Sequence, residues 1–230
     1  MANMPDIKLN TAAQQVFPVV DFNPAYDRLL AMDFTSKNTS LSEAVLKDTA
    51  AFSAYVEEEL KKHSCRYGIG GYAEHRTIYS RSEHFDTAEG EPRRLHLGTD
   101  IWGSAGTPVY CPLPARVHSY QFNDRHGDYG ATIILSHGAG EEHIYSLYGH
   151  LSLSSISGLS EGEEIRAGAR FAEFGVPEEN GHWPPHLHFQ LILDLEGMRG
   201  DYPGVCRYSE RERYLANCPD PQIILSHTFQ

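Results

Sequence analysis

Near the C-terminal end of the chain, residues 184–191 read PPHLHFQL, in which polar and apolar side chains alternate after two prolines. This alternation predicts a β-strand, because successive side chains on a strand point to opposite faces of the sheet. His186 and His188 would then share one face, about 6.6 Å apart, where both imidazoles could address one small site. The alternative is a solvent-facing polar surface that holds two histidines by chance. The other face would pack on a core through Leu187, Phe189 and Leu191.

The rest of the chain beyond residue 65 also has the character of a β protein. Short segments rich in Val, Ile, Tyr and Thr alternate with Gly and Pro. The sequence Gly138-Ala139-Gly140 predicts a hairpin connection and therefore antiparallel pairing. We expect a mainly β domain over residues 65–230, built as an antiparallel sandwich or half-open barrel. The predicted strands cover residues 76–80, 108–111, 115–122, 132–136, 143–150, 170–174 and 186–193.

The first 64 residues differ from this pattern. Up to about residue 38 we expect a loosely structured lead-in with at most a short helix around residues 26–32. Ser40 and Glu43 fit a capping box, and apolar residues recur at nearly helical spacing as far as Lys62. This pattern predicts one N-terminal amphipathic helix that docks on the β domain. The predicted division is therefore a lead-in with a docking helix, residues 1–64, followed by the β domain, residues 65–230.

Composition argues against several classes of function. The 230 residues carry 31 acidic and 19 basic side chains, a formal net charge of −12, without a dense basic run. We therefore expect no binding to nucleic acids or to anionic membranes. No stretch approaches the roughly 18 apolar residues that a membrane helix needs. Because no signal-peptide pattern is seen at the N-terminus, we expect a cytoplasmic protein whose four cysteines stay reduced.

Four of the 13 histidines stand in patterns that suggest chemistry, namely His96, His150, His186 and His188. Asp100 follows His96 by four residues, and an extended chain would separate the two by about 13 Å. The chain must bend if both are to bind one ion, and Gly98 permits that bend. With His188 as a third ligand, two imidazoles and one carboxylate form a zinc-binding set that leaves one position for water.

The two remaining histidines are candidates for proton transfer. The sequence has no H-E-x-x-H helix whose glutamate could serve a zinc hydrolase, so histidines must fill that role. His150 and His186 are left once the metal ligands are assigned, and we expect them to be catalytic. Tyr148 either shares the face of His150 or packs within the sheet, depending on whether Gly149 interrupts the alternation.

Together, the H-x-x-x-D, Tyr-Gly-His-Leu and H-x-H patterns resemble those of the lysostaphin-type zinc metallopeptidases, over roughly residues 90–195. The resemblance implies a β fold of the duplicated hybrid motif type and hydrolysis of peptide bonds in bacterial cell-wall crosslinks. It also implies a peptide or cell-wall fragment as substrate. In this sequence it assigns His96, Asp100 and His188 to zinc. It assigns His150 and His186 to catalysis.

A narrower likeness extends over about residues 66–225. Residues 71–76, 180–185 and 201–205 resemble the peptidase-like domain found between a phosphotransferase and a class III aminotransferase in certain long bacterial chains. Those chains look intracellular, where cell-wall crosslinks are absent. Two functions therefore stay open. One is a zinc peptidase acting on some peptide or amide, and the other is a cytoplasmic metal-containing module that binds a ligand or regulates a partner without peptidase activity.

Overall fold

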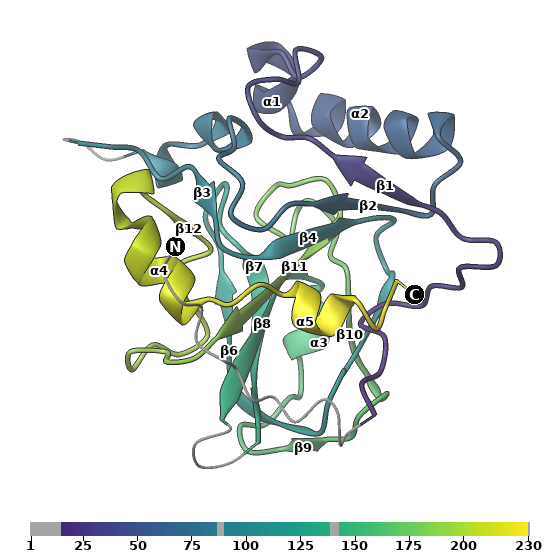
Figure 1. Cartoon of the computed structure of the whole chain (residues 1–230), viewed down its shortest axis with the longest axis vertical. Coiled ribbons are helices and arrows are strands. Elements are labelled where there is room, and N and C mark those ends of the chain that lie inside the picture. Colours follow the sequence, from purple (N-terminus) through teal and green to yellow (C-terminus); the bar gives the residue numbers. More distant parts are fainter. Residues whose placement is uncertain (1–14, 87–89, 139–142, 230) are drawn as a thin grey trace.

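The computed structural model describes residues 15–86, 90–138 and 143–229 (Figure 1). Its centre is an eight-stranded sheet with the strand order β1-β2-β4-β11-β8-β7-β6-β9. All neighbours pair antiparallel except β1 and β2, which are parallel. In sheet order the strands are β1 Leu29–Met32, β2 Tyr67–Gly70, β4 Thr99–Trp102, β11 His186–Ile192, β8 Ile144–Leu151, β7 Gly130–His137, β6 Ala115–Asn123 and β9 Glu164–Ile165.

Two small antiparallel sheets accompany the large one. The first joins β5 (Pro108–Tyr110) to β10 (Arg170–Glu173), and the second joins β3 (Leu95–His96) to β12 (Val205–Cys206). The predicted mainly β, antiparallel architecture is confirmed. The half-open barrel is wrong, because β1 and β9 lie at opposite edges of the large sheet and no pairing between described residues joins them.

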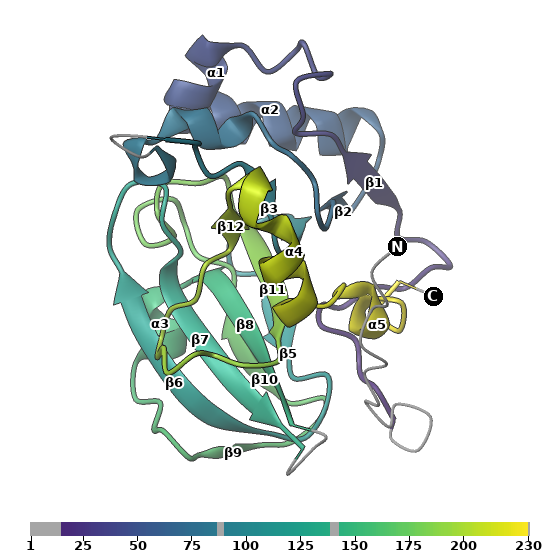
Figure 2. The ribbon, with the colours of Figure 1, turned by 60° about the vertical axis from the view of Figure 1, so that its left-hand side comes forward.

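The helices are short apart from one near the N-terminus. In chain order they are α1 Glu43–Lys47, α2 Thr49–Lys62, α3 Leu153–Ile156, α4 Arg211–Asn217 and α5 Gln222–Leu225, with 3₁₀ turns η1 Ile78–Arg81, η2 Glu83–Phe85 and η4 Tyr208–Glu210. Helices α1 and α2 lie beside β1 and β2, at the end of the molecule away from β9 (Figure 1; Figure 2). No helix in the described ranges combines the length and apolar character needed to span a membrane.

The single N-terminal helix predicted from Ser40 to Lys62 is wrong, because the chain forms two helices that meet at Asp48. The Asp48 carboxylate accepts hydrogen bonds from the backbone N–H groups of Ala50 and Ala51. These bonds satisfy the free donors of a new helix start, so α2 begins here. The predicted capping residue is also wrong, since the Ser42 hydroxyl, rather than that of Ser40, caps α1.

Two further local predictions are wrong. In one case strand pairing, and in the other a turn, replaces the structure that the local sequence pattern suggested. The short helix expected around residues 26–32 is instead strand β1, which pairs with β2 in the large sheet. The strand expected at residues 76–80 is largely the turn η1. The hairpin predicted near Gly138 is confirmed by the antiparallel pairing of β7 with β8, while residues 139–142 lie outside the described ranges. The boundary between residues 64 and 65 stays a prediction.

Strand β11 faces two packed layers. As predicted, Leu187, Phe189 and Leu191 join the main apolar core. All seven residues of β11 are nevertheless buried, so a solvent-facing surface for the histidines is wrong. A second apolar cluster supplies cover on the histidine side, and it includes Phe34, Phe52, Phe85, Trp102 and Trp183. The fold thus holds the histidines between a sheet and an aromatic layer.

Candidate metal centre

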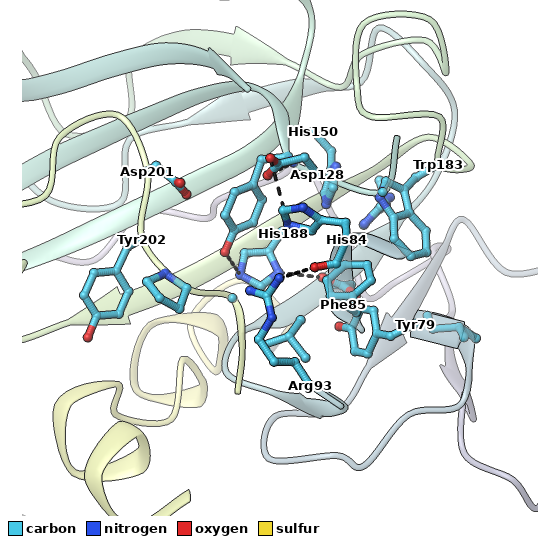
Figure 3. Close-up of a pocket in the computed structure, with 18 of the residues that line it drawn as sticks. Tyr79, His84, Phe85, Arg93, Asp128, His150, Trp183, His188, Asp201 and Tyr202 are labelled. Atoms are coloured by element: carbon cyan, nitrogen blue, oxygen red, sulfur yellow. Dashed lines mark hydrogen bonds and ion pairs between the residues drawn. The ribbon is translucent and has the colours of Figure 1, made fainter. Parts of the chain in front are cut away.

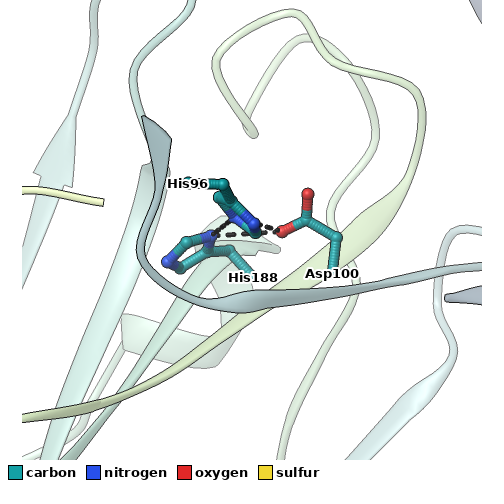
Figure 4. Close-up of side chains that lie close together, drawn as sticks. All are labelled: His96, Asp100 and His188. Carbon is teal, nitrogen blue, oxygen red and sulfur yellow. Dashed lines mark hydrogen bonds and ion pairs between the residues drawn. The ribbon is translucent and has the colours of Figure 1, made fainter. Parts of the chain in front are cut away.

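The three predicted metal ligands converge because of the sheet register. Asp100 on β4 lies directly across from His188 on β11. His96 ends β3, and the chain turns before β4 begins at Thr99, so the predicted bend is present. His96 Nε2 lies 3.0 Å from His188 Nδ1 and 3.2 Å from Asp100 Oδ1, and His188 Nδ1 lies 3.1 Å from the same oxygen (Figure 4).

Hydrogen bonds on the far sides of both imidazoles orient them for a metal ion. His96 Nδ1 donates to the carbonyl of Gly71 at 3.0 Å, and His188 Nε2 donates to the Gln190 side-chain oxygen at 2.8 Å. The opposite nitrogens therefore carry lone pairs, as zinc ligands require. A tetrahedral zinc ion with bonds of about 2.0–2.1 Å would separate its ligand atoms by roughly 3.3 Å. The measured separations are close to this, so His96, Asp100 and His188 fit zinc.

Electrostatics favour a cation at the same point. Burial lowers the pKa of His96 to about 4, with a further lowering from Arg76. Burial alone would raise the pKa of Asp100, but His96 and Arg76 together hold it well below its usual range. At neutral pH the site therefore offers a neutral His96 imidazole and the charged carboxylate of Asp100.

The predicted catalytic histidines lie side by side next to the predicted metal ligands. Their ring centroids are 4.1 Å apart. His150 Nδ1 donates to the carbonyl of Asn180 at 2.8 Å, and His186 Nδ1 donates to that of Pro184 at 2.7 Å. Burial lowers the pKa of both rings, to about 4 for His186. Each Nε2 therefore carries a lone pair, and no described protein group hydrogen-bonds to it.

His150 reaches this place through a β-bulge. Between Tyr148 and Leu151, β8 has one residue more than the facing stretch of β7. His150 adopts a left-handed backbone with φ +63°, and bulges of this kind redirect side chains beside functional sites. Tyr148 consequently packs in the core against Phe189, while His150 points into the site. The alternation is interrupted, and Tyr148 is a sheet-packing residue.

A pocket of about 290 Å³ opens over these residues (Figure 3). Asp100, His150, His186 and His188 line it, while His96 is fully buried behind them. Its apolar lining includes Ile78, Phe85, Trp102, Trp183 and Val205. Its polar lining includes His84, Arg93, Asp128, Tyr129 and Asp201.

The sequence predicted that His96, Asp100 and His188 converge, but it gave no sign of their neighbours. Arg76 donates to Asp100 Oδ2, and the Tyr129 hydroxyl lies 3.4 Å from His188 Nε2. In the sequence, Arg76 belonged only to a predicted strand and to the stretch that resembles a peptidase subgroup. Neither prediction gave it a chemical role. Neither Arg76 nor Tyr129 stands at a spacing that links it to a ligand.

Comparison with known proteins agrees with the geometry. Residues 94–199 match the model of Peptidase family M23. This segment is similar to M23 peptidases and includes all five predicted site residues. It is also 28% identical over 149 residues to the L-Ala–D-Glu endopeptidase of Bacillus subtilis (strain 168). That alignment covers 62% of this chain and 42% of the relative, so the chain spans less than half of the relative's length.

Solved structures of peptidases show a weaker likeness. A zinc-containing peptidase from Vibrio cholerae is 26% identical with a TM-score of 0.34, covering 43% of this chain and 27% of that one. The catalytic domain of lysostaphin from Staphylococcus simulans is 22% identical with a TM-score of 0.40, covering 58% of this chain and 80% of that one. The similarity to Peptidase family M23 therefore rests on the sequence match over residues 94–199.

Proposed function

We propose that this protein is a zinc-dependent peptidase that hydrolyses an amide bond in a cell-wall-derived peptide. The observation that carries the proposal is the convergence of His96, Asp100 and His188, whose donor atoms lie 3.0–3.2 Å apart at the base of a pocket. His150 and His186 present Nε2 lone pairs beside them. The M23 match over residues 94–199 supports zinc and a peptide substrate.

Each residue has a distinct role in the proposed reaction. His96, Asp100 and His188 would hold the ion, which supplies a Lewis acid that polarises a substrate carbonyl and makes water more acidic. The Nε2 atoms of His150 and His186 would accept a proton from the attacking water and return it to the leaving amine. The surrounding aromatic layer would limit access of bulk water and so strengthen these electrostatic contacts.

The size of the pocket favours a short stretch of substrate. Sites for small molecules usually enclose about 300–1,000 Å³, so 290 Å³ is at the lower end of that range. We therefore propose that a few residues of a peptide enter the pocket. The alternative, a metal-containing binding module, predicts occupancy of the same pocket without turnover.

The test begins with metal analysis of the purified chain, followed by assays on muropeptides, D-amino-acid dipeptides and small amides. We expect one zinc ion per chain and release of free amine. His150→Ala and His186→Ala should each lower kcat by about 10²- to 10⁴-fold, the usual contribution of acid–base catalysis, while retaining zinc. His227→Ala, at an exposed position, is the matched control and should leave kcat unchanged.

The outcomes separate the two functions. Full zinc occupancy without hydrolysis of any amide would favour the binding module. Failure to bind zinc after reconstitution would exclude both functions.

We also propose an intracellular location and kinship with the fused phosphotransferase and aminotransferase subgroup. The likeness at residues 71–76, 180–185 and 201–205 supports this kinship. An enzyme in that compartment would act on wall precursors or recycled fragments. Cell fractionation with an antibody to the chain tests the location, and recovery outside the cytoplasm would contradict it.

A further inference from the structure

The two oxygens of Asp100 have separate partners. Oδ1 lies between His96 Nε2 and His188 Nδ1, at 3.2 and 3.1 Å. Oδ2 instead accepts a hydrogen bond from Arg76 Nη1 at 2.5 Å. Figure 4 shows one Asp100 oxygen directed at both imidazoles and the other turned away from them. One oxygen therefore faces the ligand set, and the guanidinium of Arg76 occupies the other.

Arg76 is itself held rigidly. The side chain is fully buried, and Nε donates to Glu74 Oε2 at 2.7 Å. The guanidinium lies 5.5 Å above the ring of Phe34. A Cβ atom on Gly70 would approach Arg76 Nη2 to 2.6 Å, so the glycine makes room for the guanidinium. A buried arginine is costly unless it is paired, and Glu74 and Asp100 supply the pairing.

The same stretch of chain orients another metal ligand. The carbonyl of Gly71 accepts from His96 Nδ1 at 3.0 Å, and it also lies 3.4 Å from Arg76 Nη2. The backbone of His96 is bonded on both sides, to Ala73 and to Glu74, at 3.0 Å each. Residues 70–76 thus position both His96 and Asp100 while lying outside the M23 match at residues 94–199.

We propose that Arg76 is a positioning residue that restricts Asp100 to a single metal-coordinating oxygen. Carboxylates can bind a metal through one oxygen or two, and a second oxygen from Asp100 beside a bound water would raise the coordination number from four to five and crowd the position that a catalytic zinc site keeps open. By engaging Oδ2, Arg76 would preserve that position for water or substrate. The assignment rests on the metal site of the proposed function.

The decisive experiment replaces zinc with cobalt(II) in the full chain and records its visible spectrum, because four-coordinate cobalt absorbs several-fold more strongly than five-coordinate cobalt. Arg76→Met should retain one metal per chain but lose several-fold in band intensity. Arg76→Lys, which restores a cationic donor, should recover part of that intensity. Activity of the zinc form should fall in the same order, by about 10- to 100-fold for Arg76→Met, as is usual for residues behind a metal ligand.

A matched control is Arg66→Met. This change breaks ion pairs to Asp27 and Asp21 that have no contact with the three donors, so the spectrum should stay as in the unmodified chain. If Arg76→Met does not fold, Glu74→Gln loosens the hold on Arg76 and should lower band intensity to a smaller extent.

The possible failures are distinguishable. An unchanged cobalt spectrum in folded Arg76→Met would overturn the role of Arg76 and leave the proposed peptidase intact. The expected spectral change without hydrolysis of any peptide would support the role of Arg76 and overturn the proposed function. Absence of cobalt binding in the unmodified chain would overturn both.

Discussion

The residues that could bind zinc and the residues that surround them come from different parts of the chain. His96, Asp100 and His188 all lie within the M23 match at residues 94–199. Ten of the 20 residues that line the pocket lie outside it, in residues 78–93 and 201–205. Arg76, which pairs with Asp100, also lies outside. The matched segment thus contains the five predicted site residues and half of the pocket lining, whereas its flanks supply the other half of the lining and Arg76.

Removing one of the three predicted metal ligands, all of which lie in the matched segment, should have the largest effect on zinc binding and activity. In His188→Ala one of three donors is lost, so we expect zinc occupancy to fall below detection after dialysis and activity to fall to background. Metal analysis and amide hydrolysis measure both. His118→Ala, at a partly buried position on β6, serves as a control that should keep its zinc. Normal zinc content in His188→Ala would show that the ion binds elsewhere.

Crowding a ligand without removing it should have an intermediate effect. A Cβ atom on Gly98 would lie 2.7 Å from the His188 ring and 2.8 Å from the carbonyl of Phe189. Gly98→Ala should therefore displace His188 and weaken zinc binding about 10- to 100-fold. Overpacking should also destabilise the fold by about 1–3 kcal/mol. Competition with a coloured chelator and chemical denaturation measure the two effects.

Gly158→Ala separates crowding from backbone strain. A Cβ atom there meets nothing within 4 Å, but the backbone has φ +81°. Left-handed backbone costs a non-glycine residue about 1–2 kcal/mol, so this control should lose stability while zinc affinity is unchanged. Equal zinc affinities in Gly98→Ala and the unmodified chain would mean that the His188 ring adjusts freely.

The convergence of His96, Asp100 and His188 could be predicted from the sequence because much of it follows from local rules. Alternation on a strand places His186 and His188 on one face, and Gly98 allows the bend that brings Asp100 back to His96. The sheet register then completes the site. Both rules depend on residues close together in sequence, so they can be applied before any tertiary contact is known.

The surroundings could not be predicted, because they depend on contacts distant in sequence or on exceptions to regular structure. Arg76 reaches Asp100 across 24 positions with no fixed spacing to reveal it. The bulge that redirects His150 interrupts the regular alternation of side chains that is expected along a strand. Helical spacing continued through Asp48, yet its carboxylate caps a new helix and divides the segment. Strand β1 likewise forms by pairing with β2, which lies far from it in sequence.

The smallest predicted effect concerns the charge of Asp201, which lines the pocket and lies just beyond the M23 match. Partial desolvation of the carboxylate raises the pKa of Asp201, although the residue as a whole is exposed. Asp128 raises the pKa further, whereas Arg93 and Arg125 act in the opposite direction. The unfolded chain therefore releases this proton more readily than the folded one. Stability contributed by the protonated form is complete at low pH and is lost as the pH rises through the folded-state pKa. At neutral pH the charged Asp201 should thus destabilise the fold.

Asp201→Asn removes this charge with little change in shape, and we expect it to raise Tm at pH 7. In a chain of this length each kcal/mol corresponds to about 2–4 °C, and the rise should be smaller than this, because Asp201 is exposed and solvent screens its charge. The gain should shrink between pH 7 and pH 4, because the raised pKa favours protonation of Asp201 in the native protein as the pH falls. Thermal denaturation at both pH values measures the difference, with exposed Asp124→Asn as control.

A gain at pH 7 would mean that the pocket wall keeps a carboxylate at the expense of stability, as functional surfaces often do. A loss would mean that Asp201 stabilises the fold, and the flanks would then differ from the matched segment only in their apolar lining residues and in Arg76.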